Sequence, residues 1–259
     1  MEVTFDPQVQ DALFEYLLRL GDDALILGHR LSEWCGHGPM LEEDIALANI
    51  ALDCVGQAHA LLTLAGEVEG KGRTEDDLAY LRDTIAFRNV QLAELPRGDF
   101  GFTIARQFLF SAYAYLLYEG LRESAFAPLA GIAAKAYKEV RYHLRHCSEW
   151  FLRLGDGTAE SHRRLQTALD DLWMYTGELF ESDPILQTLI THGLTPDVPA
   201  LGPRWKEMVA AIIDQATLTL PDDDQYMATG GRTGRHTEHL GLLLAEMQVL
   251  PRSYPNAVW

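Results

Sequence analysis

Apolar residues recur at alternating intervals of three and four along most of the chain, which is the period of an amphipathic helix. The first stretch predicts a helix over about residues 8–34, with apolar positions at Leu13, Leu17, Leu20, Ala24, Leu27, Leu31 and Trp34. The same period predicts long helices over about 40–66, 101–124, 128–154 and 158–181. Shorter helices are predicted over about 75–88, 184–191, 203–215 and 236–250. Since no segment shows the period-two alternation of a strand, we expect an all-α protein.

Glycine and proline mark the breaks between these helices. Gly36-His37-Gly38-Pro39 ends the first helix, Leu95-Pro96-Arg97-Gly98 indicates a loop, and Leu154-Gly155-Asp156-Gly157 ends the fourth long helix. The resulting order of helix pair, connector and helix pair is typical of a ferritin-like four-helix bundle. We expect this core bundle over about residues 8–154, with additional C-terminal helices over about 158–250. No linker rich in proline, glycine or serine divides the chain, so residues 1–259 are expected to form a single domain.

Two of the predicted helices carry apolar seams on which a metal-binding bundle would place its ligands. In the helix over 40–66 the apolar seam consists of Leu41, Ile45, Ala48, Leu52 and Val55, and an adjoining stripe carries Ile50, Cys54, Gln57 and Leu61. In the helix over 128–154 the seam consists of Leu129, Ala133, Ala136, Val140, His143, Cys147 and Trp150. A carboxylate-bridged iron pair in such a bundle uses Glu-x-x-His on two helices and one Glu on each of two others.

In this chain those ligand positions carry other residue types. They read Cys54-x-x-Gln57 and Val140-x-x-His143 on two helices, with Ala24 and Ser111 on the other two. Iron prefers carboxylate oxygen and imidazole, so His143 alone is a competent ligand. Asp23 lies one residue from the seam, which turns its side chain by about 100°. We therefore expect a degenerate metal site without metal, in which Gln57 and Ser111 hydrogen-bond a structural His143.

Charge and cysteine usage narrow the classes of function. The formal net charge of −17 argues against binding to nucleic acid or to anionic membranes, because both require neutralisation of phosphate. Cys35, Cys54 and Cys147 form no CxxC pair, so neither a disulfide framework nor a structural zinc site is expected. No apolar run reaches the roughly 20 residues of a membrane span. The N-terminus lacks the pattern of a signal peptide, so we expect a cytoplasmic protein.

Several segments carry a resemblance to a known family. They are LGDDAL (20–25), EWCGH (33–37), DIALANIALDCVGQ (44–57), TIARQ (103–107), KEVRYHLR (138–145) and GGRTGRHTEHLGLLLAEMQ (230–248). Over about residues 17–250 the chain resembles the C-subunit family of the bacterial phenylacetyl-CoA epoxidase complexes. DCVGQ (53–57) also resembles the Asp-Glu-Ala-Gly-His stretch of the catalytic A subunit, with Cys54 in place of Glu and Gln57 in place of His.

The resemblance implies a ferritin-like subunit that binds no cofactor itself and pairs with the catalytic A subunit. In such complexes the A subunit holds a di-iron centre and epoxidises the ring of phenylacetyl-CoA with dioxygen. A small B subunit and a flavin and iron–sulfur reductase complete the system. Residues 1 to about 11 are expected to lie outside the family pattern and are assigned no role. Two alternatives stay open: an active di-iron oxygenase with atypical ligands, and a stand-alone acyl-CoA binding module.

Three further groups of residues could serve such a complex. Contacts to substrate or coenzyme A are possible at Phe87, Arg88, Asn89, Arg232 and Arg235, although an ordinary turn would also explain the glycine-rich segment around the last two. A basic stripe on the helix over 128–154 suits a subunit interface and consists of Lys135, Lys138, Arg141 and Arg145. His236, Glu238 and His239 could form a contact between subunits, a wall of a substrate channel, a weak zinc site or simply the first turn of a helix.

Aromatic residues spread around more than one face of the helix over 101–124. A helix that is apolar on several sides is buried on several sides. The spread therefore predicts an extra layer beyond the bundle core, as at a subunit interface with aromatic anchors.

Overall fold

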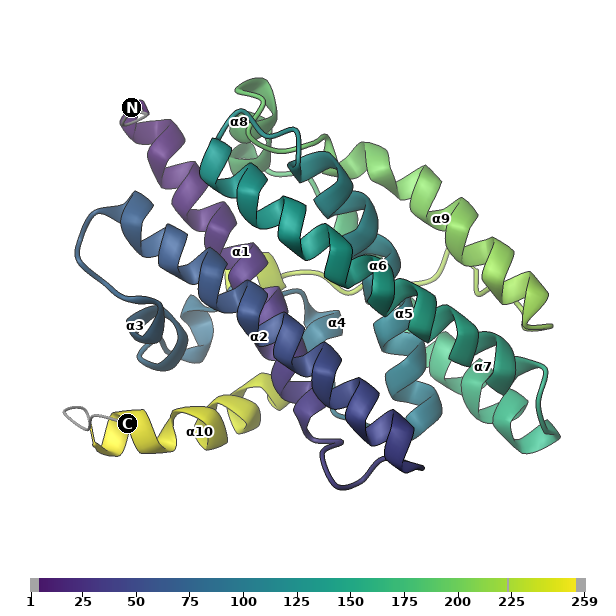
Figure 1. Ribbon diagram of the computed structural model, residues 1–259. Helices are drawn as coiled ribbons and strands as arrows, with labels where there is room; N and C mark the ends of the chain where they lie inside the picture. Colours follow the sequence, from purple (N-terminus) through teal and green to yellow (C-terminus); the bar gives the residue numbers. More distant parts are fainter. Residues whose placement is uncertain (1–4, 223, 255–259) are drawn as a thin grey trace.

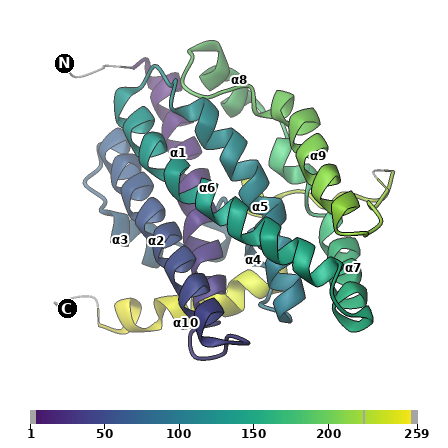
Figure 2. The same cartoon turned by 45° about the vertical axis from the view of Figure 1, so that its right-hand side comes forward.

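Helices account for all the regular secondary structure in the computed structural model, which describes residues 5–222 and 224–254 (Figure 1). The four long helices are α1 (Pro7–Ser32), α2 (Leu41–Glu69), α5 (Phe100–Leu121) and α6 (Ala127–Gly155). Helices α1 and α2 pack along each other, as do α5 and α6, and the two pairs face each other across the core (Figure 2). The predicted all-α, ferritin-like bundle is confirmed.

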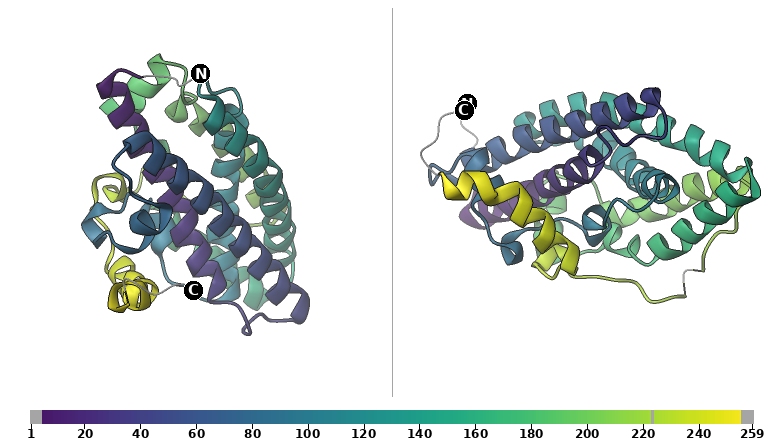
Figure 3. Two further views of the ribbon diagram at one scale, coloured as in Figure 1. Left: turned by 60° about the vertical axis from the view of Figure 1, so that its left-hand side comes forward. Right: turned by 90° about the horizontal axis from the view of Figure 1, so that it is seen from below.

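The shorter elements form a further layer behind this bundle. The connector between the two pairs contains α3 (Glu75–Tyr80), η1 (Thr84–Ala86) and α4 (Gln91–Glu94). After α6 come α7 (Ala159–Trp173), η2 (Gly177–Phe180), α8 (Pro184–Thr191) and α9 (Val198–Gln215). The last elements are η3 (Gly231–Thr233) and α10 (Glu238–Ser253). Seen from below, α2 and α6 form one outer layer, α1 and α5 the middle, and the shorter helices the opposite side (Figure 3).

Three helix boundaries differ from those predicted. The helix predicted over 75–88 ends at Tyr80, and the helix predicted over 158–181 ends at Trp173. Helix α9 begins at Val198 and continues through Pro203, because the Asp197 side chain accepts a hydrogen bond from the backbone N–H of Ala200 and caps its start. Periodicity placed the elements correctly but not these ends, which depend on caps and on tertiary contacts.

The two apolar stripes of the second helix differ in burial. The stripe of Leu41, Ile45, Leu52 and Val55 lies on the surface, where these residues are 71, 52, 68 and 40% exposed. The adjoining stripe faces the core, as expected for Cys54, and buries Ile50, Cys54, Gln57 and Leu61.

Close packing of α1 explains which stripe of α2 is buried. A Cβ atom on Gly28 of α1 would lie 3.1 Å from Cβ of Cys54, and one on Gly21 would lie 2.7 Å from Leu62. Glycines seven residues apart thus let the two helices approach on the Cys54 side of α2. Since α2 has two apolar stripes, its period alone could not identify the inward one.

Helix α5 is buried on almost every side, as its distribution of aromatic residues predicted. The layer that covers it comes from the same chain and not from a partner. The indole Nε1 of Trp205 donates to the carbonyl oxygen of Leu109 over 3.1 Å, and the rings of Tyr113 and Phe180 lie 5.7 Å apart. The aromatic side chains of α5 are therefore core residues rather than anchors at a subunit interface.

Helix α2 is long and apolar enough to cross a membrane by length and composition alone. Half of its most apolar segment is buried against the rest of the bundle. Such partial burial is typical of a core helix. It does not explain why the second apolar stripe of α2, from Leu41 to Val55, is exposed.

Candidate functional site at the centre of the bundle

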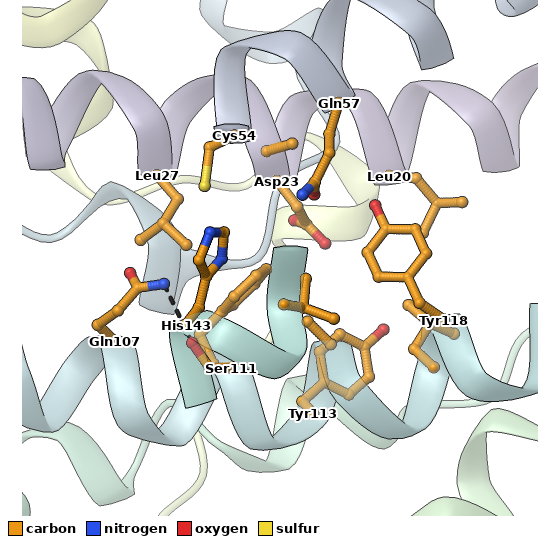
Figure 4. Close-up of a pocket in the computed structure, with 15 residues that line it drawn as sticks. Leu20, Asp23, Leu27, Cys54, Gln57, Gln107, Ser111, Tyr113, Tyr118 and His143 are labelled. Atoms are coloured by element: carbon orange, nitrogen blue, oxygen red, sulfur yellow. Dashed lines mark hydrogen bonds between the residues drawn. The ribbon is translucent and has the colours of Figure 1, made fainter. Parts of the chain in front are cut away.

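All six positions predicted for a degenerate metal site line one central cavity. Ala24 lies on α1, Cys54 and Gln57 on α2, Ser111 on α5, and Val140 and His143 on α6. Figure 4 shows the α1 and α2 side chains facing those of α5, with the imidazole of His143 between them. The water-accessible volume of the cavity is about 20 Å³, enough for a single water molecule.

His143 is buried, but its partners differ from those expected. Its Nε2 lies 2.9 Å from Oδ2 of Asp53 on α2. Gln57 instead donates from Nε2 to Oε2 of Glu139 over 2.9 Å. Ser111 accepts a hydrogen bond of 3.1 Å from Nε2 of Gln107, one turn earlier on α5. The predicted hydrogen bonds from Gln57 and Ser111 to His143 are therefore wrong. Gln57 bonds to Glu139 and Ser111 to Gln107 instead.

Asp23 also lines the cavity, and its carboxylate is fully engaged away from the centre. Nη1 and Nη2 of Arg232 donate to its two oxygens over 2.9 and 2.8 Å, and the backbone N–H of Val90 donates over 2.8 Å. Burial raises the pKa of Asp23, while Arg232 acts in the opposite direction. This carboxylate holds the last segment of the chain against α1 and is not free to bind a metal ion.

The residues present do not fit a carboxylate-bridged iron pair. Ala24 and Val140 have no ligand atom, and none of the six side chains at these positions is a carboxylate that could bridge two irons. Within residues 5–222 and 224–254, no group of three or more His, Cys, Asp or Glu side chains could hold a metal ion. The donor set is thus too poor for the chemistry of a di-iron oxygenase.

The two thiols near the centre behave as packed apolar groups. Burial raises the pKa of Cys54 to about 12 and raises the pKa of Cys147 further above its ordinary value. Because the thiolate is the reactive form, neither side chain is activated as a nucleophile. Cys35, at the end of the first helical segment, is the exposed cysteine.

The facing sides of α2 and α6 are joined by three polar pairs, which we call the α2–α6 seam: Glu43 with His146, Asp53 with His143, and Gln57 with Glu139. None of the three carboxylates was predicted to have a role. Asp53 and Glu139 each directly precede a cavity residue in the chain, so they lie at the edge of the inward face. Their place next to predicted cavity residues is the sequence feature that could have identified Asp53 and Glu139. Each carboxylate lies one residue away from a position that an iron site would use.

A second group of polar residues lies in the layer behind the bundle. Four buried carboxylates bind cations or backbone N–H groups of the segments 82–94 and 228–237: Asp22, Asp23, Glu94 and Glu178. Glu178, for example, accepts from the backbone N–H groups of Gln91, Gly230 and Gly231 over 2.7, 3.0 and 2.5 Å. The glycine-rich segment is therefore a tightly bound turn.

Two of the residues predicted to contact coenzyme A are inaccessible. Phe87 and Asn89 are fully buried, which contradicts the prediction for these two, while Arg232 pairs with Asp23 and lines a second cavity behind the bundle. Nε of Arg88 lies 2.5 Å from a carboxylate oxygen of Glu15. Arg235 is exposed and stays available for such a contact.

The three residues predicted as a possible contact around the start of α10 differ in their accessibility. His236 is enclosed, with Nδ1 2.8 Å from Oε2 of Glu94 and Nε2 3.1 Å from the carbonyl oxygen of Phe87, so neither an interface role nor zinc binding suits it. Glu238 is exposed and His239 is half-buried. Thr237 caps the helix by accepting from the backbone N–H of His239.

His236 makes the anchoring of α10 dependent on pH. Burial alone would lower its pKa, but the hydrogen bond and charge of Glu94 outweigh burial and raise the pKa. The stabilisation is complete below the pKa of an unfolded histidine and is lost as the pH rises through the raised folded value. We expect amide hydrogen exchange in residues 230–240 to become faster, after correction for intrinsic rates, as the pH rises above about 6.5, the ordinary pKa of histidine. A His236→Asn variant should lose this dependence, and an unchanged dependence in that variant would assign it to other groups.

The basic stripe lies on the outer side of α6, next to α2. Lys135, Lys138, Arg141 and Arg145 are all exposed, and Lys135 Nζ lies 3.7 Å from Oε1 of Glu139. The guanidinium group of Arg145 lies 5.6 Å from the ring centre of Tyr142, which is itself 41% exposed. The stripe and the exposed apolar seam of α2 thus lie on solvent-exposed sides of the two helices that form one outer layer of the bundle (Figure 3).

Comparison with known proteins identifies relatives along nearly the whole chain. Residues 3–259 match the family model described as phenylacetic acid catabolic protein. The chain is 49% identical over 247 residues to the C subunit of the 1,2-phenylacetyl-CoA epoxidase of Escherichia coli (strain K12), and the match covers 95% of this chain and 99% of the relative. Because the family match begins at residue 3, the expectation that residues 1–11 lie outside the family pattern is wrong for all but the first two. Residues 1–4 lie outside the described structure.

Proposed function

Since the chain belongs to the phenylacetic acid catabolic protein family, we propose that it is the non-catalytic subunit of a phenylacetyl-CoA epoxidase. In this proposal it binds no metal or cofactor and pairs with a homologous catalytic A subunit, which supplies the di-iron centre. The small B subunit and the flavin and iron–sulfur reductase complete the assembly. The complex acts on phenylacetyl-CoA in the cytoplasm.

The observation that carries the non-catalytic role is the content of the central cavity. The cavity lies where a ferritin-like oxygenase would hold its irons, and the six side chains at the expected positions provide one imidazole and no carboxylate. A chain that has kept this fold without the ligands must contribute through binding. Its function is then to be sought on its surface.

The α2–α6 face supports pairing with another helical protein. Leu41, Ile45, Ala48, Leu52 and Val55 follow the alternating four-and-three spacing with which one helix packs along another. The outer side of α2 and α6 is not covered by any other helix of the described residues (Figure 3). A stripe of this length on a free surface is typical of a protein–protein interface.

Charge on this face favours an acidic partner. The chain is strongly acidic overall, yet Lys138, Arg141 and Arg145 are exposed on α6, which forms the same outer layer as α2 (Figure 3). A partner that places acidic side chains opposite α6 and apolar ones opposite α2 would match both features. The homologous catalytic subunit, built from the same amphipathic helices, is the partner we propose.

Metal analysis of the purified chain, produced with iron and with the catalytic homologue present or absent, tests the proposal. We expect less than about 0.1 iron per copy of this chain alone, since the cavity lacks the carboxylates of an iron pair. A stable heteromer should turn over phenylacetyl-CoA, whereas neither chain alone should do so.

Two results would contradict parts of this proposal. Close to two irons per chain, with the absorbance of an oxo-bridged centre, would indicate an oxygenase with atypical ligands. Tight binding of phenylacetyl-CoA to the isolated chain, without assembly, would favour a stand-alone acyl-CoA binding module.

A further inference from the structure

The central cavity contains a buried polar atom without a partner. Gln107 on α5 is 1% exposed, and its Nε2 donates to Ser111, but its Oε1 has no hydrogen-bond partner among the described residues. Both residues line the cavity, as Figure 4 shows. An unpaired carbonyl oxygen in the core is costly, and a water molecule is the simplest group that could satisfy it.

The dimensions and chemistry of the cavity suit one water molecule. About 20 Å³ is accessible to water, and most of the surrounding surface is aliphatic or aromatic, which excludes an ion. A water molecule could donate to Oε1 of Gln107 and accept from the hydroxyl of Ser111, whose oxygen already accepts from Gln107. These are two of the two to four partners that an ordered buried water typically has.

One wall separates this cavity from a groove on the surface. The groove lies between α2 and α6, has a water-accessible volume of about 360 Å³, and includes Gly56, Ala60 and Gly131 in its lining. Gln57 lines both the groove and the cavity, while Glu139 lines the groove. The hydrogen bond from Gln57 to Glu139 therefore closes the space between them.

This wall is easier to open than the others. Gln57 and Glu139 are joined by a single hydrogen bond between side chains, and the Glu139 side chain is 18% exposed. A second cavity behind the bundle shares Leu20 and Tyr113 with the central one, but both side chains are packed within the core. Small residues at positions 56, 60 and 131 leave space beside Gln57 into which its side chain can turn.

We propose that the central cavity is a hydration site that exchanges with solvent through the α2–α6 groove, with the Gln57–Glu139 hydrogen bond closing the opening. The site takes water or an uncharged molecule of similar size. This inference does not depend on the identity of the partner subunit.

Labelling of Cys54 measures the opening, because this thiol lines the cavity beside Gln57. The full chain carries Cys35→Ser to remove the exposed thiol and is treated with methyl methanethiosulfonate, with each cysteine followed by mass spectrometry. We expect Gln57→Ala to accelerate labelling of Cys54 at least about tenfold, and Glu139→Ala to accelerate it in the same direction, because either change removes the closing hydrogen bond. Cys147 is fully buried and does not line the cavity, so its rate should not change.

The matched control is Glu43→Gln, which alters the Glu43–His146 pair in the same seam but away from the cavity. It should leave the Cys54 rate within about twofold of the parent chain, as expected of a change at a distant site. An unchanged rate in Gln57→Ala would overturn the proposed route, as would equal acceleration of Cys147, which reports global opening. Acceleration by Leu20→Ala alone would place the route on the opposite side and overturn it as well.

The hydration itself is tested in a crystal structure of the full chain at a resolution that shows ordered water. Density within hydrogen-bond distance of both Gln107 Oε1 and Ser111 Oγ is expected, and it should vanish in Gln107→Leu. An empty cavity in the parent chain would overturn the hydration site.

Discussion

Replacing Val140 with Glu is expected to destabilise the protein by about 3 kcal/mol or more, the cost of burying a carboxyl group without a partner. Val140 is 3% exposed and lines the central cavity beside His143, whose Nε2 is already paired with Asp53. The new carboxyl group would therefore find no free cation, and the cavity has room for no more than about one water molecule to solvate it. Urea denaturation monitored by circular dichroism at about pH 7 measures the loss.

The pH dependence of Val140→Glu gives a second and independent readout. Burial would raise the pKa of the introduced carboxyl group above its unfolded value, so the neutral form is the one tolerated in the core. The difference in unfolding free energy from the parent chain should consequently be smaller at about pH 5 than at about pH 8. Lys138→Glu, an exposed change on the same helix, is the control and should cost less than about 0.5 kcal/mol. Parent-like stability of Val140→Glu would mean that this position does not face the core.

Replacing Leu52 with Glu is expected to weaken assembly with the proposed catalytic partner at least about 100-fold, or about 2.7 kcal/mol. Leu52 lies in the middle of the exposed stripe of α2 and is 68% exposed in the isolated chain. A charge at the centre of an apolar contact must be desolvated without compensation, and an acidic partner would also repel it. Isothermal titration calorimetry of the two purified subunits gives the change in Kd.

The matched control for this prediction lies on another face of the molecule. Leu242 of α10 is also 68% exposed, so Leu242→Glu makes the same chemical change at equal exposure. It should leave the Kd within about threefold, and both variants should unfold within about 0.5 kcal/mol of the parent chain. Equal loss of affinity in the two variants would point to a general effect of charge, and loss only in Leu242→Glu would move the interface to α10.

The local sequence pattern was sufficient to predict the long helices and the positions that line the central cavity. The 3.6-residue period predicted α1, α2, α5 and α6 to within a few residues at each end. The spacing between Ala24 and Cys54, and between Ser111 and Val140, brought these four positions to one level of the bundle. Such predictions succeed because helix period and rise are the same in every helix, whatever surrounds it.

Which partner each side chain found was decided by the tertiary structure. Both stripes of α2 are apolar, and the close approach of α1 at Gly28 selected the one that carries Cys54. His143 pairs with Asp53 rather than with Gln57, because the Gln57 side chain bonds to Glu139 in the α2–α6 seam. Hydrogen-bond partners depend on shifts of a few ångströms between helices, and a one-dimensional pattern does not record these shifts.

The segments between the helices show most clearly what the sequence pattern predicts and what the tertiary contacts decide. Phe87, Asn89 and Arg232 have side chains that suit a ligand, and the sequence offered no reason to bury them. In the folded chain Asp23 and Glu178 bind residues more than fifty positions away and draw both segments into one buried layer. Residue type and spacing alone thus specified the helices, the bundle and the residue types at the cavity positions, because these are local properties of the chain. Burial and pairing were left to the tertiary structure, because they arise from contacts between residues far apart in the chain.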